Sequence, residues 1–326
     1  MDEAELKNHL PAALAARVQS LRQSGKTVTL VLDAGGLDAA ARDALERDAR
    51  AALDGVSGVD EVRVALMADR PSDAKPARRI IAVASGKGGV GKSTLTTNLA
   101  VALVQMGRKV GLVDADIYGP SQPRLLANEG QRPQAREKSL IPVPSDAGVP
   151  VLSMGHLAPV GKAIAWRGPM VSNALTQLME ADWGDVEVLL VDMPPGTGDI
   201  QLTMVQRFRP AGVVIVSTPQ DLALIDATRA AQLFEHAQVP IIGVVENMAG
   251  YACPHCGEVS DPFGQGGAEA EAARMGVAFL GRVPLAMAIR QASDAGIPPA
   301  VGDNPAGEAF RTIAARLATW LDNTRV

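Results

Sequence analysis

The chain has 326 residues, of which 47% are hydrophobic and 21% are charged, and its formal net charge is −5. This composition is typical of a globular protein with room for one large and one small domain. The negative charge argues against broad attraction to nucleic acid or to anionic lipid, and we expect neither as a partner. The start, MDEAELKNHL, has charges where a signal peptide needs an apolar core, and no run approaches the ~20 apolar residues of a membrane span. The sequence therefore predicts a cytoplasmic protein.

The first part of the chain has the pattern of a small α/β domain. Its expected elements are helices over 12–22 and 41–53 and strands over 28–33 and 61–67. The following segment, ADRPSDAKPARR, is rich in Pro, Ser and charge, which is typical of a linker. We expect a small N-terminal domain over 1–67, the linker over 68–79 and a larger domain over 80–326.

In the larger domain, short β-branched runs alternate with helical patterns. Several runs are almost continuously apolar, as in strands that are covered on both faces. The expected strands are 80–85, 109–115, 186–193, 212–218, 240–247 and 277–283. Helices between successive strands imply right-handed βαβ crossovers, so the predicted fold is α/β with a doubly wound, mostly parallel sheet.

The first of these strands leads into SGKGGVGKST, residues 85–94, and then into a helical pattern. The segment from Gly86 to Ser93 fits the phosphate-binding loop G-x-x-x-x-G-K-[ST] in its strand, loop, helix context. Its glycines let backbone N–H groups surround phosphate oxygens, Lys92 reaches the β and γ phosphates, and Ser93 offers a hydroxyl to Mg2+. The predicted ATP-binding residues of this loop are Gly86, Lys87, Gly88, Gly89, Val90, Gly91, Lys92, Ser93 and Thr94.

Three aspartates follow strands that should end beside this loop, at the sheet edge where open α/β folds bind ligands. Asp192, in LLVDMPPGTGD, is suited to hold Mg2+ through a water molecule. Asp114 and Asp116, in VDADIYGPS, lie two residues apart, so both point to the same side unless the strand ends between them. Either can orient the attacking water.

The octapeptide KGGVGKST resembles the deviant phosphate loop of the ATPases grouped with MinD, ParA and the nitrogenase iron protein. A closer resemblance, over roughly residues 79–323, is to the Mrp or ApbC type of iron-sulfur cluster carrier. The segments that carry it are DADIYGPS, WRGPM, VDMPPGTGD, STPQ, ENMAGYACPHCG and FGQGGAEA.

The resemblance implies a role for each matching position. Lys87 would cross a dimer interface to the partner's nucleotide, and Lys92 would bind phosphate. Asp116 would position the water and Asp192 would hold Mg2+ indirectly, so these four are the catalytic candidates. The resemblance also implies that Asn247 and Pro284 line the adenine. Residues 1–67 weakly resemble the small domain that often precedes the ATPase in bacterial members, without its usual Asp-Pro turn.

The chain has two cysteines, Cys253 and Cys256, in YACPHCGEV. A four-thiolate metal site needs two more ligands than this pair supplies. If ATP brings two chains together about a two-fold axis, the pair meets its own copy and provides four thiolates. The resemblance implies that a 4Fe-4S cluster then bridges the homodimer. A zinc-bridged dimer and a dithiol redox pair stay open as alternatives.

The leading hypothesis is an ATP-binding, weakly hydrolysing dimer that assembles a 4Fe-4S cluster and delivers it to apo iron-sulfur proteins. A MinD-like or ParA-like positioning ATPase is the main alternative, and electron transfer like that of the nitrogenase iron protein ranks last. A positioning ATPase needs a basic face or a basic amphipathic terminal helix. The C-terminal segment does have an apolar stripe, but the mixed charges on its other face favour docking to the core over membrane binding. The stripe consists of Phe310, Ile313, Leu317, Trp320 and Leu321.

Overall fold

The computed structural model describes residues 6–7, 9–34, 37, 39–67, 78–117, 119–136, 139–157 and 168–324. The chain divides into two compact units, Met1–Pro76 and Ala77–Val326. Most of the predicted linker lies outside the described residues, as do Tyr118 and residues 166–167 of the motifs quoted above. Within the described residues, no helix has both the length and the apolar character needed to cross a membrane.

The smaller unit is a three-stranded sheet, in the order β1-β2-β3, packed against a helix. Its elements are α2 Ala12–Ala15, β1 Val18–Ser24, β2 Thr27–Asp33, α3 Ala39–Leu53 and β3 Glu61–Met67. The predicted strands and the predicted helix over 41–53 are confirmed. The predicted helix over 12–22 is wrong beyond Ala15, because Val18–Ser24 pairs antiparallel with β2. A tight turn with Gly25 at φ +61° joins the two strands and fixes this hairpin.

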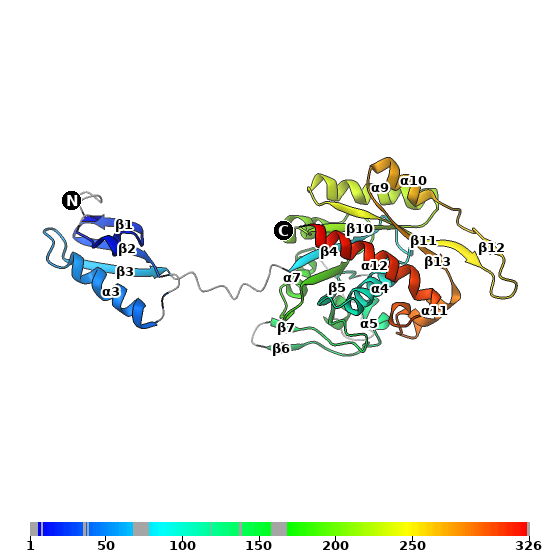
Figure 1. Ribbon diagram of the computed structural model, residues 1–326, viewed down its shortest axis with the longest axis horizontal. Helices are drawn as coiled ribbons and strands as arrows, with labels where there is room; N and C mark the ends of the chain where they lie inside the picture. The colour runs from blue at the N-terminus through cyan, green and yellow to red at the C-terminus, as the bar shows by residue number, and fades with distance from the viewer. Residues whose placement is uncertain are drawn as a thin grey trace. The chain divides into compact units, whose positions relative to one another are not determined.

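The larger unit is built on an eight-stranded sheet with the order β12-β11-β10-β4-β9-β5-β8, in which β13 also pairs with β11 (Figure 1). All of these pairings are parallel except that of β12 with β11. The strands are β4 Arg79–Ala84, β5 Val110–Asp114, β8 Val151–Ser153, β9 Val188–Asp192, β10 Gly212–Ser217, β11 Ile241–Ala252, β12 Val259–Ser260 and β13 Phe279–Leu285. A separate two-stranded ribbon consists of β6 Gln134–Arg136 and β7 Ser139–Ile141. The doubly wound, mostly parallel α/β fold is therefore confirmed.

Helices cover both faces of the large sheet, which explains why its strands are apolar throughout. One face packs against α4 and α12, the other against α7 and α9, as the buried side chains of the two core clusters show. The helices are α4 Lys92–Gln105, α5 Gln122–Leu125, α6 Met154–Leu157, α7 Gly168–Met179, α8 Asp199–Thr203, the π-helix η1 Met204–Phe208, α9 Asp221–His236, α10 Gly267–Met275, α11 Met287–Asp294, the 3₁₀-helix η2 Pro299–Val301 and α12 Pro305–Asn323.

The C-terminal helix α12 docks on the sheet, as its apolar stripe predicts. Phe310, Ile313, Leu317 and Leu321 are at most 1% exposed. In addition, the Arg79 guanidinium at the start of β4 donates to the carbonyl oxygens of Leu321 and Thr324. The apolar face that a membrane-binding helix would need is therefore used in the core of this protein.

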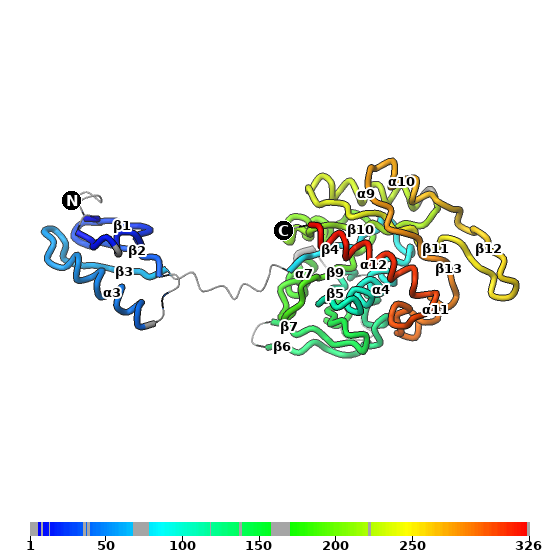
Figure 2. Tube along the Cα trace, viewed as in Figure 1, coloured from blue at the N-terminus to red at the C-terminus, as the bar shows by residue number. Residues whose placement is uncertain are grey.

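The order of the strands in the large sheet determines where a ligand-binding crevice lies. β4 lies between β10 and β9, so the chain moves outward from β4 in both directions across the sheet. A crevice forms at the carboxyl ends of strands where the order reverses in this way. The loop after β4, Asp116 after β5, Pro195 after β9 and Asn247 in β11 all line cavities in this region. Figure 2 shows the trace, with β11 and β13 running side by side as their pairing requires.

Candidate functional site

The phosphate-binding loop joins β4 to α4. Gly91 is the N-cap of α4 with φ +80°, a conformation that favours glycine, and Lys92 is the first residue of the helix. The chain also needs a glycine at position 86, because a Cβ there would lie 2.0 Å from the backbone carbon of Asp226 in α9. The N-terminus of α4, with its unpaired N–H groups and positive dipole end, therefore opens into this loop, which is the arrangement that binds phosphate.

Two adjoining cavities meet at the start of α4. The smaller, of about 240 Å³, is lined by the phosphate loop together with Asp116, Gly119 and Pro195. The larger, of about 450 Å³, is mostly apolar and lies between α5, α11 and the end of β13. Gly91, Ser93 and Thr94 line both cavities. A cavity with a half-polar lining thus adjoins a mostly apolar one, which suits the phosphates and the base of one nucleotide.

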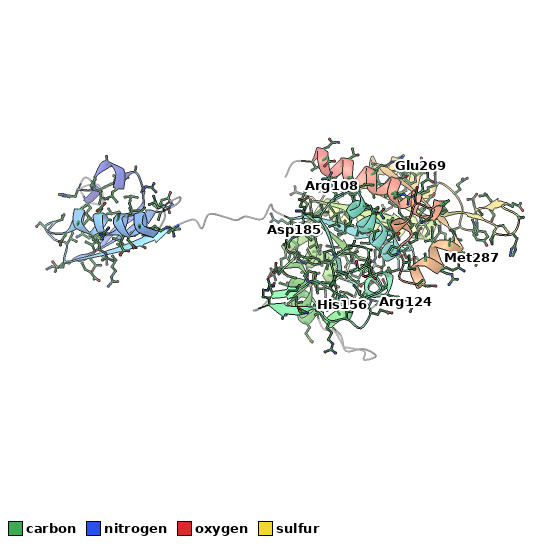
Figure 3. The ribbon with its side chains drawn as sticks, turned by 60° about the horizontal axis from the view of Figure 1, so that its bottom comes forward. Arg108, Arg124, His156, Asp185, Glu269 and Met287 are labelled. Atoms are coloured by element: carbon green, nitrogen blue, oxygen red, sulfur yellow. The ribbon has the colours of Figure 1, made fainter. Side chains whose placement is uncertain are left out.

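The predicted base-lining residues Asn247 and Pro284 both line the larger cavity. The Asn247 amide donates to the Val90 carbonyl oxygen at 2.7 Å. A Cβ at position 91 would lie 2.0 Å from that amide nitrogen, so Gly91 is also required by this close approach. The cavity has further residues that the sequence did not single out, among them Ile289 in α11 and Arg124 in α5, which is labelled in Figure 3.

A buried ion pair lies behind the phosphate loop. The Lys92 ammonium is 2.5 Å from the Asp192 carboxylate, and their side chains are only 6% and 0% exposed. Asp192 ends β9, so the parallel register of β9 with β4 brings it beside the start of α4. The lysine predicted to bind phosphate is thus held by the aspartate predicted to hold Mg2+.

Gln122, which the sequence analysis did not identify, organises the same region. Its side-chain amide donates to the second oxygen of Asp192 at 2.9 Å and to the Ser93 carbonyl oxygen at 3.1 Å. Its own carbonyl oxygen accepts from the Thr97 hydroxyl at 2.5 Å. Gln122 is fully buried and joins the phosphate-loop helix to the end of β9. The signal for it in the sequence is its place directly after DADIYGPS, but a glutamine there has no chemistry that marks it.

The two aspartates after β5 have different environments. The strand ends at Asp114, so the strand alternation that would place both side chains on one side does not extend to Asp116. Asp114 is fully buried and accepts hydrogen bonds from the backbone N–H groups of Ser121 and Gln122 and from the Ser153 hydroxyl. Burial, and then the charge of Asp192, raise the pKa of Asp114 to about 7.

Asp116 lies closer to the phosphate loop. It is half-buried, it lines the smaller cavity, and its carboxylate accepts the backbone N–H of Gly119 at 3.2 Å. Lys87 and Ser93 line the same cavity, and Lys87 is exposed. Of the two aspartates left open by the sequence, Asp116 is the one that a nucleotide in this cavity would meet.

The two cysteines lie at the tip of a hairpin. β11 extends five residues beyond its predicted end at 247 and pairs there with β12, and this hairpin projects from the body (Figure 1). The turn closes with the Gly257 N–H donating to the Cys253 carbonyl at 2.8 Å, and Gly257 has φ +75°. Cys256 is exposed and Cys253 partly exposed, and both thiols are free.

The turn favours the thiolate form of the first cysteine. Backbone N–H groups of Cys256 and His255 donate to the Cys253 sulfur, and these bonds, that of Cys256 first, lower the pKa of Cys253. A thiolate is the form that binds a metal. In the described part of the chain, no three or more His, Cys, Asp or Glu side chains come together as a group that could hold a metal ion.

Comparisons with known proteins identify the family of the chain. The family described as ParA: NUBPL iron-transfer P-loop NTPase matches residues 76–318. A protein of Pseudomonas fragi named iron-sulfur cluster carrier protein is 52% identical over 229 residues, covering 69% of this chain and 79% of its own. A protein of the same name from Methanocaldococcus jannaschii is 46% identical over 248 residues, covering 75% and 86%.

Solved structures show the same fold. The Archaeoglobus fulgidus nucleotide-binding protein in complex with ADP, with cobalt, is 36% identical with a TM-score of 0.63, covering 73% of this chain and 93% of its own. The cell division ATPase MinD of Pyrococcus furiosus is 25% identical with a TM-score of 0.56, covering 74% and 99%. With the family match over most of the chain, the phosphate loop and the fold, these similarities lead to one conclusion: the chain belongs to the NUBPL iron-transfer family of P-loop NTPases.

Proposed function

We propose that the protein binds and hydrolyses ATP, assembles a 4Fe-4S cluster between two copies of itself, and transfers that cluster to apo iron-sulfur proteins. The observation that carries the proposal is the placement of β11. Asn247, in the middle of this strand, contacts the phosphate loop, and Cys253 and Cys256 follow the strand's last residue, Ala252, on an exposed hairpin. A nucleotide pocket and a pair of metal-binding thiols are thus joined by a single strand.

ATP would occupy the two adjoining cavities. Its phosphates would lie in the smaller cavity at the N-terminus of α4, and its adenine between Asn247 and Pro284 in the larger one. Lys92 would exchange Asp192 for the β and γ phosphates, which requires the buried ion pair to open. The name of the Archaeoglobus relative, a nucleotide-binding protein in complex with ADP, supports this use of the fold.

The donor set beside the phosphate loop fits Mg2+. This ion binds a few protein oxygens, several waters and the phosphates of its nucleotide. Ser93 supplies a hydroxyl at the cavity wall, and Asp192 supplies a carboxylate fixed by Lys92 and Gln122. Mg2+ bound there would neutralise charge that develops on the phosphates. Asp116 would orient the attacking water, and Lys87, exposed at the mouth of the cavity, would reach the nucleotide of the partner copy.

The cluster is the cargo of the reaction. One chain supplies two thiolates, and two chains related by a two-fold axis supply the four that a 4Fe-4S cluster needs. An exposed hairpin suits this role, because it can meet its own copy and can later present the cluster to a recipient. The relatives named iron-sulfur cluster carrier proteins support this assignment over a MinD-like positioning role. The docked α12 also argues against the amphipathic membrane helix that such a role would use.

Anaerobic purification followed by iron, sulfide and zinc analysis tests the proposal. We expect about four irons and four sulfides for every two chains, with brown colour. A Cys253→Ala, Cys256→Ala variant should lose the iron, the sulfide and the brown colour. It should keep the melting temperature and the ATP affinity of the natural chain, because both thiols lie away from the core. Colourless protein with stoichiometric zinc, or with no metal after reconstitution with iron and sulfide, would replace the cluster with a zinc or thiol-redox function.

A further inference from the structure

The two ends of the segment that carries the cysteines meet at one buried carboxylate, that of Glu246. Glu246, in β11, is fully buried. It accepts the backbone N–H of Ala268 at 2.9 Å and that of Gly266 at 3.4 Å. The chain between Glu246 and Ala268 includes the whole cysteine hairpin, so one side chain closes the base of this excursion.

Arg282 completes the closure. It is the register partner of Glu246 in the neighbouring strand β13, and its guanidinium donates to the Glu246 carboxylate at 2.9 Å. The same guanidinium also pairs with Glu269, in the first turn of α10, which is labelled in Figure 3. A buried carboxylate needs such partners, since without them its desolvation is strongly unfavourable. Glu246 and Arg282 therefore form a clamp across β11, β13 and α10.

The outgoing end of the excursion touches the phosphate loop. Asn247 follows Glu246 directly and donates to the Val90 carbonyl oxygen. Beyond it, Met248 has φ +59° and Gly250 has φ +73°, so the backbone bends twice before the cysteines. Glu246, the residue before Asn247 in β11, is fixed by the clamp. A nucleotide that displaces Asn247 therefore acts on β11 directly beside the clamp.

The returning end has a second route to the phosphate loop. Gly267 lies so close to Pro219 that a Cβ on it would be 2.6 Å from the Pro219 carbonyl oxygen. Pro219 leads into α9, where Asp226 lies against Gly86 of the phosphate loop. Both ends of the cysteine excursion thus adjoin elements that contact the loop, and the clamp joins the two ends.

We propose that Glu246 and Arg282 are positioning residues that couple the nucleotide pocket to the cysteine hairpin. With the clamp intact, a change at Asn247 or at α9 alters how the thiols are presented. With the clamp broken, the pocket and the hairpin respond independently. The inference rests on the proposed function only in taking ATP as the nucleotide, and it does not depend on a bound cluster.

The rate at which the thiols are alkylated provides the test, because the chain has no cysteines other than this pair. Metal-free, reduced protein is treated with iodoacetamide with and without ATP and Mg2+. We expect the nucleotide to change the rate roughly fivefold or more in the natural chain. In Arg282→Gln the two rates should become nearly equal, while ATP affinity stays within about threefold of the natural value. A purely structural role would change both rates together and leave their ratio intact.

A matched control removes a similar ion pair from the same helix. Arg274 pairs with Glu271 of α10, its side chain is 66% exposed, and it contacts neither Glu246 nor Glu269, so Arg274→Gln should keep the natural ratio. Glu246→Gln keeps the shape of the side chain, and its alkylation rates with and without ATP should become nearly equal, as in Arg282→Gln. Melting temperatures verify that each variant is folded. Equal rates with and without ATP in the natural chain, or a natural ratio in Arg282→Gln, would overturn the inference. A chain that bound no ATP would overturn it too, whereas a chain without a cluster would fail only the metal analysis.

Discussion

The ion pair between Lys92 and Asp192 should stabilise the nucleotide-free protein strongly. Its two charged groups are 2.5 Å apart, and their side chains are 6% and 0% exposed. Lys92→Met leaves the Asp192 carboxylate buried without its cation, a change that destabilises a protein by about 3–5 kcal/mol. Gln122 still donates to that carboxylate, so we expect the lower end, about 3 kcal/mol.

A double variant separates the pair from other effects. In Lys92→Met, Asp192→Asn both charges are absent and the buried volume is nearly kept. We expect its loss of stability to be smaller than the sum of the two single losses by about 2–3 kcal/mol, because the partners are in direct contact. An Arg290→Gln variant, which removes an exposed pair with Asp294, is the control and should change stability by less than about 1 kcal/mol.

Urea unfolding of the nucleotide-free protein, followed by tryptophan fluorescence, measures these values. All three tryptophans, Trp166, Trp183 and Trp320, belong to the larger unit, so the signal reports the unit that contains the ion pair. A loss of about 3 kcal/mol corresponds to a melting temperature lower by roughly 6–12 °C for a unit of this size. Additive single and double losses would show that the pair does not exist in the nucleotide-free protein.

Three further predictions concern the same crevice. Gln122→Met removes the amide that orients Asp192, so it should weaken Mg2+ binding to the ATP complex by roughly 10- to 100-fold; a titration of Mg2+ with a fluorescent nucleotide measures this, and an equal loss of affinity in EDTA would contradict it. Because the pKa of Asp114 is raised to about 7 in the folded protein, its contribution to stability is full below about pH 4 and is lost as the pH rises to about 7; Asp114→Asn should lack this fall, and an unchanged pH profile of urea midpoints would refute it. Lys87→Ala should keep ATP affinity but abolish ATP-dependent dimerisation in sedimentation experiments, and unaltered dimerisation would exclude a role across the interface.

The features of the site that lie close together in the sequence were predictable from it. The phosphate loop needs only ten consecutive residues and a strand and helix beside them, and the structure has both. Most strands of the large sheet were also predictable, because burial on both faces makes them apolar throughout. The helix over 12–22 failed because a hairpin partner decides the conformation of Val18–Ser24, and local periodicity does not include that partner.

Contacts between residues that are distant in the chain could not be predicted from the sequence. Gln122 meets Asp192 across 70 positions, and its importance follows from three hydrogen bonds that no local pattern encodes. The length of β11 is a similar case, since its last residues are a strand only because β12 pairs with them. The clamp of Glu246 and Arg282 likewise depends on the register of β11 with β13.

In the proposed function, two chains share one cluster through their cysteine pairs. Native mass spectrometry of anaerobically reconstituted protein measures the number of chains and the bound metal in one experiment. We expect a species of two chains with about four irons and four sulfides, absent from the Cys253→Ala, Cys256→Ala variant. A single chain with bound metal, or two chains joined by one zinc ion, would contradict it.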